Sequence, residues 1–388
     1  MFSNTTEYIL NFGPHHPSTH GVLRLILKLS GETVISCDPD IGYLHRGVEK
    51  LVESKKFLSI IPYIDRLDYL SPLIQEHAYV LALEKLLKLE VPKRAQLIRV
   101  IFDELTRISS HIMGIGSMTY DLGCLSLFLY GFEEREKIMD IFESVTGSRM
   151  HQAYYVPGGV FEDVSDDVLK MISRFIKGLK TYLNSVEKLA LDNRIFQKRT
   201  QNVGTISKDF AIESGLSGVN LRASGIPYDI RSSLQYGAYE TLQFTPITLS
   251  SGDSYARAKL RYLEISQSAN LIEQCLDKIK PGPTCSFRHL EKPKIRNSIE
   301  EITYSNLFTK GIELPANSTV YSAVETPRGE FGTHLFVEQD QHKPYRLRFK
   351  SPSFAAIQTL KSLLVGSSLP DVTTILGSLD FIMGCCDR

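Results

Sequence analysis

Residues 92–112 read PKRAQLIRVIFDELTRISSHI, and this stretch decides the fold class of the chain. A proline opens it, which suits the first turn of a helix, where no backbone N–H is needed. An apolar stripe that repeats about every 3.6 residues predicts an amphipathic helix with one buried face. The stripe consists of Ile98, Ile101, Phe102, Leu105, Ile108 and Ile112.

Further helical patterns lie on both sides of this stretch. Ser71 is a candidate N-cap followed by Pro72, which predicts a helix to about Glu90. A third amphipathic stretch ends near Gly147, a candidate C′ glycine, and another runs over 164–193. A long helix is expected after Asp253, stopped by the Pro-Gly-Pro of 281–283. The central part of the chain is therefore expected to be a helical bundle.

Strand patterns occur at the two ends of the chain. Leucines at 23, 25, 27 and 29 alternate with other residues, and Ser30-Gly31 turns this strand into a second one at 33–37. Short strands are expected again at 320–324, 334–338 and 345–349, while 199–252 is irregular and rich in Gly, Ser, Asn and Pro. The fold class is α+β, one composite domain with a helical core and small β-sheets at both ends. Its parts are an N-terminal β-hairpin and loop region (1–60), a helical core (61–195), an irregular region with a long helix (196–315) and a C-terminal β-rich region (316–388).

Composition excludes several classes of function. The 388 residues carry 44 Lys plus Arg and 44 Asp plus Glu, so the net charge is zero, which argues against nucleic acid or an anionic lipid surface as the main partner. No run of 18 or more apolar residues is present, so no transmembrane segment is expected. The first residues show no targeting pattern, and the chain is expected to work in the compartment where it is made. Six cysteines without a Cys-x-x-Cys pair favour a reducing compartment and argue against an iron–sulfur cluster held by this chain alone.

Histidines gather in the first part of the chain, most densely at His15, His16 and His20 in GPHHPSTHG, residues 13–21. Histidine titrates near neutral pH and is the commonest metal ligand. The H-x-x-x-H spacing is that of a helical zinc pair, but Pro17 stands where a helix interior would lie and no HExxH glutamate is present. A loop whose imidazoles cap backbone groups is as good an interpretation of the residues alone.

Five other residues are candidates for chemistry, each with an ordinary structural alternative. Tyr69 stands just before the predicted helix start, beside Arg66, and a buried core tyrosine is the ordinary interpretation. Asp121 either caps a turn or orients a cation such as His20. Arg46 and His151 could each pair with an acid at the surface.

Taken together, a series of motifs resembles the 49 kDa core subunit family of respiratory complex I, a family related to nickel–iron hydrogenase large subunits. The similarity runs in order from about residue 10 to the C-terminus. The motifs are GPHHPSTHGVLR (13–24), IGYLHRGVEK (41–50), DRLDY (65–69), FEERE (132–136), LRASG (221–225), RGEFG (328–332), PYR (344–346) and the terminal DR. The resemblance implies a hydrogenase-large-subunit-like fold. It also implies that the chain is of the mitochondrially encoded type of this subunit.

The resemblance also implies roles for the candidate residues. His20 and Tyr69 match the pair that brackets a quinone head group, where they would donate hydrogen bonds to its carbonyl oxygens and supply protons. Asp121 matches the acid that pairs with that histidine. Arg46 and His151 match residues beside the terminal cluster, and Arg66 matches an arginine of the pocket wall.

The implied cofactors and partners follow from the same resemblance. Ubiquinone is the expected substrate, and electrons are expected from a [4Fe-4S] cluster ligated mainly by a small partner subunit. The other expected partners are the adjoining matrix-arm core subunit and the membrane-arm quinone-channel subunit, at the matrix side of the mitochondrial inner membrane. No glycine-rich dinucleotide loop follows a strand, so no NAD site is expected on this chain.

One departure from the hydrogenases bears on the metal. Their nickel–iron site uses two Cys-x-x-Cys pairs, whereas this chain has Asp68 and Ser71 at the first pair and only Cys385 in the segment that begins at Asp380. With three of four ligands replaced, no nickel–iron centre is expected.

Two alternatives remain open within the family. A plastid-type relative would reduce plastoquinone, although the HQAY segment at 151–154 looks more like the respiratory branch. An inactive structural scaffold would have no need of His20, Tyr69 and Asp121 together.

Overall fold

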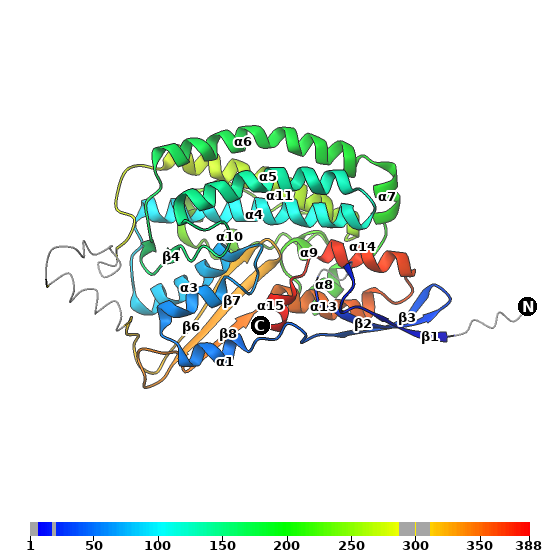
Figure 1. The fold of residues 1–388 in the computed structure, drawn as a ribbon, viewed down its shortest axis with the longest axis horizontal. Helices are drawn as coiled ribbons and strands as arrows, with labels where there is room; N and C mark the ends of the chain where they lie inside the picture. Colours follow the sequence, from blue (N-terminus) through cyan, green and yellow to red (C-terminus); the bar gives the residue numbers. More distant parts are fainter. Residues whose placement is uncertain (1–6, 18–20, 287–298, 300–310) are drawn as a thin grey trace, which may run out of the picture.

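Four long helices form the main layer of the molecule. The computed structural model describes residues 7–17, 21–286, 299 and 311–388. Within them α4 (Lys93–Asp121) packs against α5 (Leu125–Thr146) and α11 (Ser254–Lys278), while α6 (Asp166–Val186) covers α5. The four helices lie side by side along the long axis (Figure 1). The predicted stripe on α4 is fully buried, which confirms the helix and its inward face.

Some helix ends follow from local chemistry. The Asp253 carboxylate accepts the Ala256 N–H at 2.8 Å and starts α11, and Gly147 ends α5 with a left-handed φ of 73°. Helix α3 (Pro72–Leu87) does begin after Ser71, but the Ser71 side chain makes no capping bond. Its hydroxyl instead donates to Asp68 Oδ2 at 2.6 Å, so the predicted cap is right in position and wrong in its contact.

Two antiparallel three-stranded sheets flank the helical layer. The N-terminal sheet has the order β1 (Glu7–Phe12), β2 (Arg24–Ser30), β3 (Thr33–Asp40), and the second sheet the order β6 (Ser318–Thr326), β7 (Gly329–Val337), β8 (Arg346–Lys350). The alternating leucines at 23–29 have no exposed surface, which confirms the predicted β2–β3 hairpin. Strand β1 is an addition to the elements that the sequence predicts. Its side chains are mostly exposed, so it carries no clear alternation.

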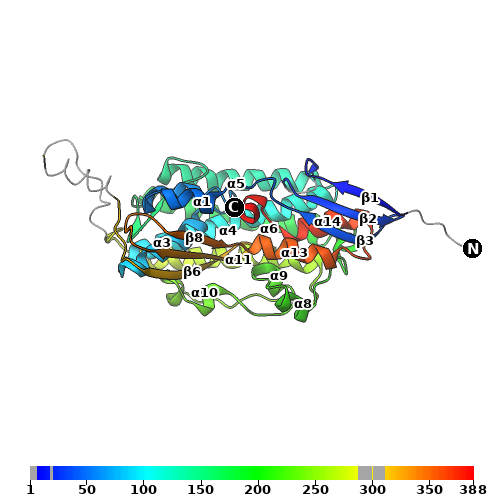
Figure 2. The ribbon, with the colours of Figure 1, turned by 90° about the horizontal axis from the view of Figure 1, so that it is seen from below.

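The C-terminal region contains more helix than the sequence suggests. Residues 316–388, predicted as β-rich, contain β6–β8 followed by α13 (Pro352–Leu363), α14 (Leu369–Leu379) and α15 (Met383–Asp387). Helix α13 packs on β3, and α14 packs on α4 and α11. Seen from below, the β6–β8 sheet, α13 and the β1–β3 sheet follow one another along the long axis (Figure 2).

Short elements complete the fold. The irregular region 199–252 is built of brief helical turns, as its composition predicts. The α+β class is confirmed, and among the described residues no helix is both long and apolar enough to cross a membrane. Among the described residues, the remaining α-helices are α1 (Val48–Leu51), α2 (Ile61–Ile64), α7 (Arg194–Thr200), α8 (Lys208–Glu213), α9 (Gly218–Arg222) and α10 (Ile230–Ser233), and the remaining strands are β4 (Tyr155–Val156) and β5 (Gly159–Val160).

Candidate functional site

Tyr69 lies in the turn that joins α2 to α3, with 39% of its surface exposed. Partial burial raises the pKa of its hydroxyl above the usual value, while the nearby Arg328 guanidinium acts in the opposite direction. The hydroxyl is therefore a protonated donor at neutral pH, on a side chain that solvent reaches. This is the accessibility that a hydrogen-bond donor to a substrate requires, and a core tyrosine would lack it.

A buried row of charges lies next to Tyr69. Arg328 donates to Asp68 Oδ2 at 2.8 Å and pairs with Asp380 Oδ1 at 3.3 Å, and Arg261 lies 3.8 Å from the other Asp380 oxygen. The side chains of these four residues are at most 9% exposed. A buried guanidinium between two carboxylates is held rigidly, because leaving any member unpaired in the interior is costly. The row fixes the turn that carries Tyr69.

The residues that the family resemblance places at hydrogenase ligand positions, Asp68, Ser71 and Cys385, lie near Arg328. The Ser71 hydroxyl donates to Asp68, and Cys385 Sγ lies 3.0 Å from the Ser351 hydroxyl. Burial raises the pKa of the Cys385 thiol to about 12, so it is not a thiolate at neutral pH. The described residues contain no group of three or more His, Cys, Asp and Glu side chains arranged to hold a metal ion.

Arg46, Arg66 and His151 come together on one side of the same turn. Arg46 Nη2 donates to the Arg66 carbonyl at 2.6 Å. Burial lowers the pKa of His151, and the guanidiniums of Arg66 and Arg46 lower it further. His151 is thus neutral at neutral pH in this chain, and it has a left-handed φ of 59°. The structure brings together three residues that lie far apart in the sequence.

Of the predicted pair His20 and Asp121, the structure describes only Asp121. Asp121 is the last residue of α4 and is partly buried. His20 lies outside the described residues, so its pairing with Asp121 and its distance from Tyr69 remain predictions. In the same loop, the His16 ring lies 4.3 Å from the Phe12 ring, which is a packing contact.

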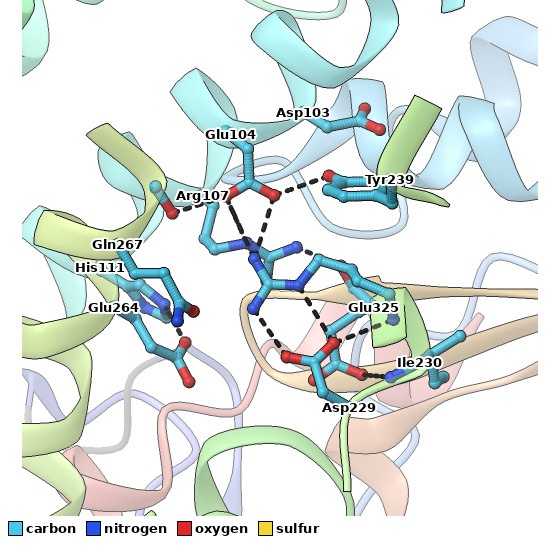
Figure 3. Close-up of polar contacts among 12 residues, drawn as sticks. Asp103, Glu104, Arg107, His111, Asp229, Ile230, Tyr239, Glu264, Gln267 and Glu325 are labelled. Atoms are coloured by element: carbon cyan, nitrogen blue, oxygen red, sulfur yellow. Dashed lines mark hydrogen bonds and ion pairs between the residues drawn. The ribbon is translucent and has the colours of Figure 1, made fainter. Parts of the chain in front are cut away.

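A second charged cluster, not predicted from the sequence, lies deeper in the molecule. Figure 3 shows Glu104 of α4 on one side and Asp229 and Glu325 on the other, with guanidinium groups between them. Every side chain in it is at most 1% exposed. We call this set the buried ion cluster; it consists of Glu104, Arg107 and His111 of α4, Arg222 of α9, Asp229 and Arg231 at α10, Glu264 of α11 and Glu325 of β6.

Arg222 is shared by three carboxylates of the buried ion cluster. Its guanidinium lies 2.7 Å from Glu264, 2.7 Å from Glu325 and 3.6 Å from Asp229. Burial alone would raise the pKa of Glu264, but Arg222 and His111 hold it well below its usual value. A sequence signal for part of the cluster did exist: Glu104, Arg107 and His111 recur at helical spacing, so they share one face of α4.

The β6–β7 hairpin connects the two charged regions. Its tip pairs Thr326 with Gly329, so Glu325 precedes the turn and Arg328 lies within it. Glu325 belongs to the buried ion cluster and Arg328 to the row beside Tyr69. A displacement of this tip would therefore disturb both.

Comparison with known proteins supplies the family. The model of the family described as "Respiratory-chain NADH dehydrogenase, 49 Kd subunit" matches residues 121–388. The chain is 46% identical to an NADH-quinone oxidoreductase subunit of Rickettsia felis, over the full length of both proteins. It is 45% identical to the protein of the same name from Ehrlichia chaffeensis, over 99% of this chain and 98% of the relative. The chain belongs to the family of 49 kDa subunits of the respiratory-chain NADH dehydrogenase.

Proposed function

We propose that this chain is the core subunit that forms part of the quinone-reduction site of an NADH:quinone oxidoreductase, and that it acts only within that complex. The observation that carries the proposal is the accessible side chain of Tyr69 beside the rigid row of Asp68, Arg328 and Asp380. Family membership supports the oxidoreductase complex, and the geometry supports Tyr69 as the substrate-contacting group.

Reduction of a quinone to a quinol takes up two electrons and two protons, and negative charge develops on the carbonyl oxygens. Tyr69 would donate a hydrogen bond to one oxygen and His20 to the other, and both could supply the protons. Asp121 would orient the His20 imidazole and stabilise its charged form. Arg328 holds the turn that carries Tyr69 through its ion pairs with Asp68 and Asp380, so the hydroxyl keeps a fixed position toward a bound substrate.

The electron donor would be a [4Fe-4S] cluster held mainly by a small partner subunit. When bound, such a cluster supplies the electrons for the reduction. On this chain Arg46, Arg66 and His151 form a cationic and polar patch, of the kind that stabilises a reduced cluster at an interface. The adjoining matrix-arm core subunit and the membrane-arm quinone-channel subunit are the other proposed partners.

Two broader elements belong to the same proposal. Quinone reduction at this site would be coupled to proton pumping by the complex. The location would be the matrix side of the mitochondrial inner membrane, whereas the Rickettsia and Ehrlichia relatives are bacterial proteins.

Replacement of Tyr69 by phenylalanine tests the site. The variant is expected to assemble normally and to lose quinone reductase activity by on the order of 100-fold, because one hydrogen-bond donor to a developing oxyanion is removed. Activity of the intact complex and a native gel provide the two measurements. Tyr345→Phe is the control, since that residue is also exposed, at 57%, and lies just before β8. Normal activity and inhibitor sensitivity in assembled Tyr69→Phe would contradict the proposal.

A further inference from the structure

Two carboxyl groups are buried beneath the loop that carries His151. Asp65, at the end of α2, and Glu76, in α3, are both fully buried. Asp65 Oδ2 accepts the Ala153 N–H at 3.1 Å. Glu76 Oε2 accepts the N–H groups of Tyr154 and Tyr155 at 2.8 and 3.0 Å. One oxygen of each carboxyl is thus engaged with the backbone of residues 153–155.

The second oxygen of each carboxyl, Asp65 Oδ1 and Glu76 Oε1, is buried without a donor in the described part of the chain. The two side chains nevertheless lie within hydrogen-bonding reach of one another. Ionised carboxylates only accept hydrogen bonds, so a hydrogen bond between these two carboxyl groups requires a proton. Two unprotonated carboxylates at this separation in the interior would repel strongly.

We propose that Asp65 and Glu76 bind one proton between them at neutral pH, carried on Oε1 of Glu76 and donated to Oδ1 of Asp65, and that the protonated pair holds the His151 loop in place. This arrangement satisfies both remaining oxygens with a single O–H···O hydrogen bond. It leaves one negative charge on the pair. The proton site is independent of the proposed function, whereas the importance of holding His151 rests on it.

The surroundings favour retention of the proton. Burial raises the pKa of Asp65 to about 6, although hydrogen bonds from Glu76 and Ala153 and the charge of Arg66 oppose this. Burial, and then the charge of Asp65, raise the pKa of Glu76 well above its usual value. The Arg66 guanidinium donates to the carbonyl of Pro62 rather than to either acid.

The other groups around the pair do not neutralise it. His151, on the overlying loop, has a lowered pKa and is neutral at neutral pH. Tyr155, on β4, directs its hydroxyl to Asp103 Oδ1 at 2.9 Å, and that aspartate also pairs with His77 Nδ1 at 2.6 Å. Asp103 of α4, which faces Tyr155, is thus already paired. The bound proton is what offsets the second negative charge.

The loop above the pair needs to be held. His151 and Ala153 have φ angles of 59° and 45°, in the left-handed region that side chains with a Cβ rarely adopt. Such conformations persist only where surrounding contacts fix them. The three N–H bonds from residues 153–155 to the pair are contacts of this kind. The pair is therefore a positioning element for His151.

A comparison of amide substitutions in the intact complex tests the proton. In Glu76→Gln the amide oxygen would accept from Tyr154 and Tyr155, and the NH2 group would replace the proposed O–H donor. The amount of assembled complex on a native gel is expected to stay within about twofold of the unaltered protein, because the substitution copies the protonated acid.

Glu84→Gln is the matched control on the same helix. Glu84 is also buried, at 5% exposure, and accepts the Gly158 N–H at 2.8 Å, but it pairs with Arg99 at 2.6 Å. Its amide leaves a buried guanidinium without a charged partner, so assembly is expected to fall by roughly tenfold or more. Equal losses in the two variants would overturn the proposal, because they would mean that Glu76 is ionised.

The dependence on pH gives a second measurement. A carboxyl group whose pKa is higher in the folded protein than in the unfolded chain stabilises the fold when it is protonated. This stabilisation is complete at a pH below the pKa of the unfolded chain, and it is lost as the pH rises toward the pKa of the folded protein. The unaltered complex should therefore lose heat resistance relative to Glu76→Gln as pH rises above the pKa of the unfolded chain, and the ratio of half-lives should change steadily with pH. A ratio independent of pH would overturn the proposal.

The positioning role has its own readout. Glu76→Leu removes the acceptor for the 154–155 backbone, so it should alter the pH profile of quinone reduction, and Glu76→Gln should restore the normal profile. Identical profiles in the assembled leucine and glutamine variants would overturn this part. Normal activity of Tyr69→Phe would contradict the quinone site and leave the amide comparison unaffected.

Discussion

Replacement of Arg222 by methionine is expected to remove about 3–5 kcal/mol from the stability of the subunit. The guanidinium is fully buried and pairs with Glu264, Glu325 and Asp229. Without it, these carboxylates would face one another in the interior, where no water screens their charge. Because a folded domain is stable by only about 5–15 kcal/mol, the amount of assembled complex on a native gel should fall several-fold or more.

Arg149 provides the control for this prediction. It also pairs with three acids, Glu136, Asp140 and Glu143, but on the surface, with 42% of its side chain exposed. Exposed ion pairs contribute little because water and salt screen them. Arg149→Met is therefore expected to leave the amount of assembled complex nearly unchanged. Similar losses in the two variants would show that burial does not determine the effect.

The apolar pattern of the sequence is sufficient to predict much of the fold. The stripe on α4 and the alternating leucines of β2 are repeats whose period is set by backbone geometry, so each predicts its element directly. Helices α13 to α15 escape such a prediction. They are short, and polar residues such as Thr359 and Ser378 lie among their buried side chains, so the apolar repeat is interrupted.

Charged residues within helices predict tertiary contacts less well than the apolar pattern predicts helices and strands. Glu104 and Arg107 are ordinary helix formers, and their burial depends on partners such as Arg231 of α10, which lies 127 residues after Glu104 in the chain. Ser71 has the residue type of a cap, yet its hydroxyl bonds to Asp68. Local propensity predicts neither contact, because tertiary partners decide both.

The candidate site shows the same division. The start of α3 after Ser71 follows from the sequence. The family resemblance alone places Arg46 beside His151, and the structure is needed to show that Arg66 lies with them. In the sequence, Arg328 stands out only as part of a motif. Its position between two carboxylates depends on the β6–β7 hairpin, whose distance from the turn along the chain hides the contact.

The hairpin tip is held by a close backbone contact. Gly218, the first residue of α9, has a φ of +64°, and a Cβ atom built on it would lie 2.4 Å from the Cα of Gly329. Backbone atoms cannot rotate away as a side chain can. Helix α9 and the RGEFG motif therefore meet here, and the contact sets the position of both Glu325 and Arg328.

Gly218→Ala is expected to cost about 1–3 kcal/mol in backbone strain and a further 1–3 kcal/mol in overpacking. Since the tip must move, Arg328 would shift from Asp68 and Glu325 from Arg222, so both charged regions would be weakened at once. The expected result is a several-fold lower amount of assembled complex on a native gel, and lower quinone reductase activity per assembled complex.

Gly215→Ala separates the two contributions. Gly215 has nearly the same φ, +65°, but a Cβ there would meet no atom within 4 Å in the described part of the chain. Gly215→Ala should therefore show the cost of backbone strain without overpacking. We expect a smaller loss of assembled complex and normal quinone reductase activity per assembled complex. If Gly215→Ala and Gly218→Ala behave alike, the close approach to Gly329 does not position the hairpin. If only Gly218→Ala loses activity per complex, the contact between α9 and the hairpin tip controls the geometry around Tyr69, even though it acts only through Arg328 and Asp68.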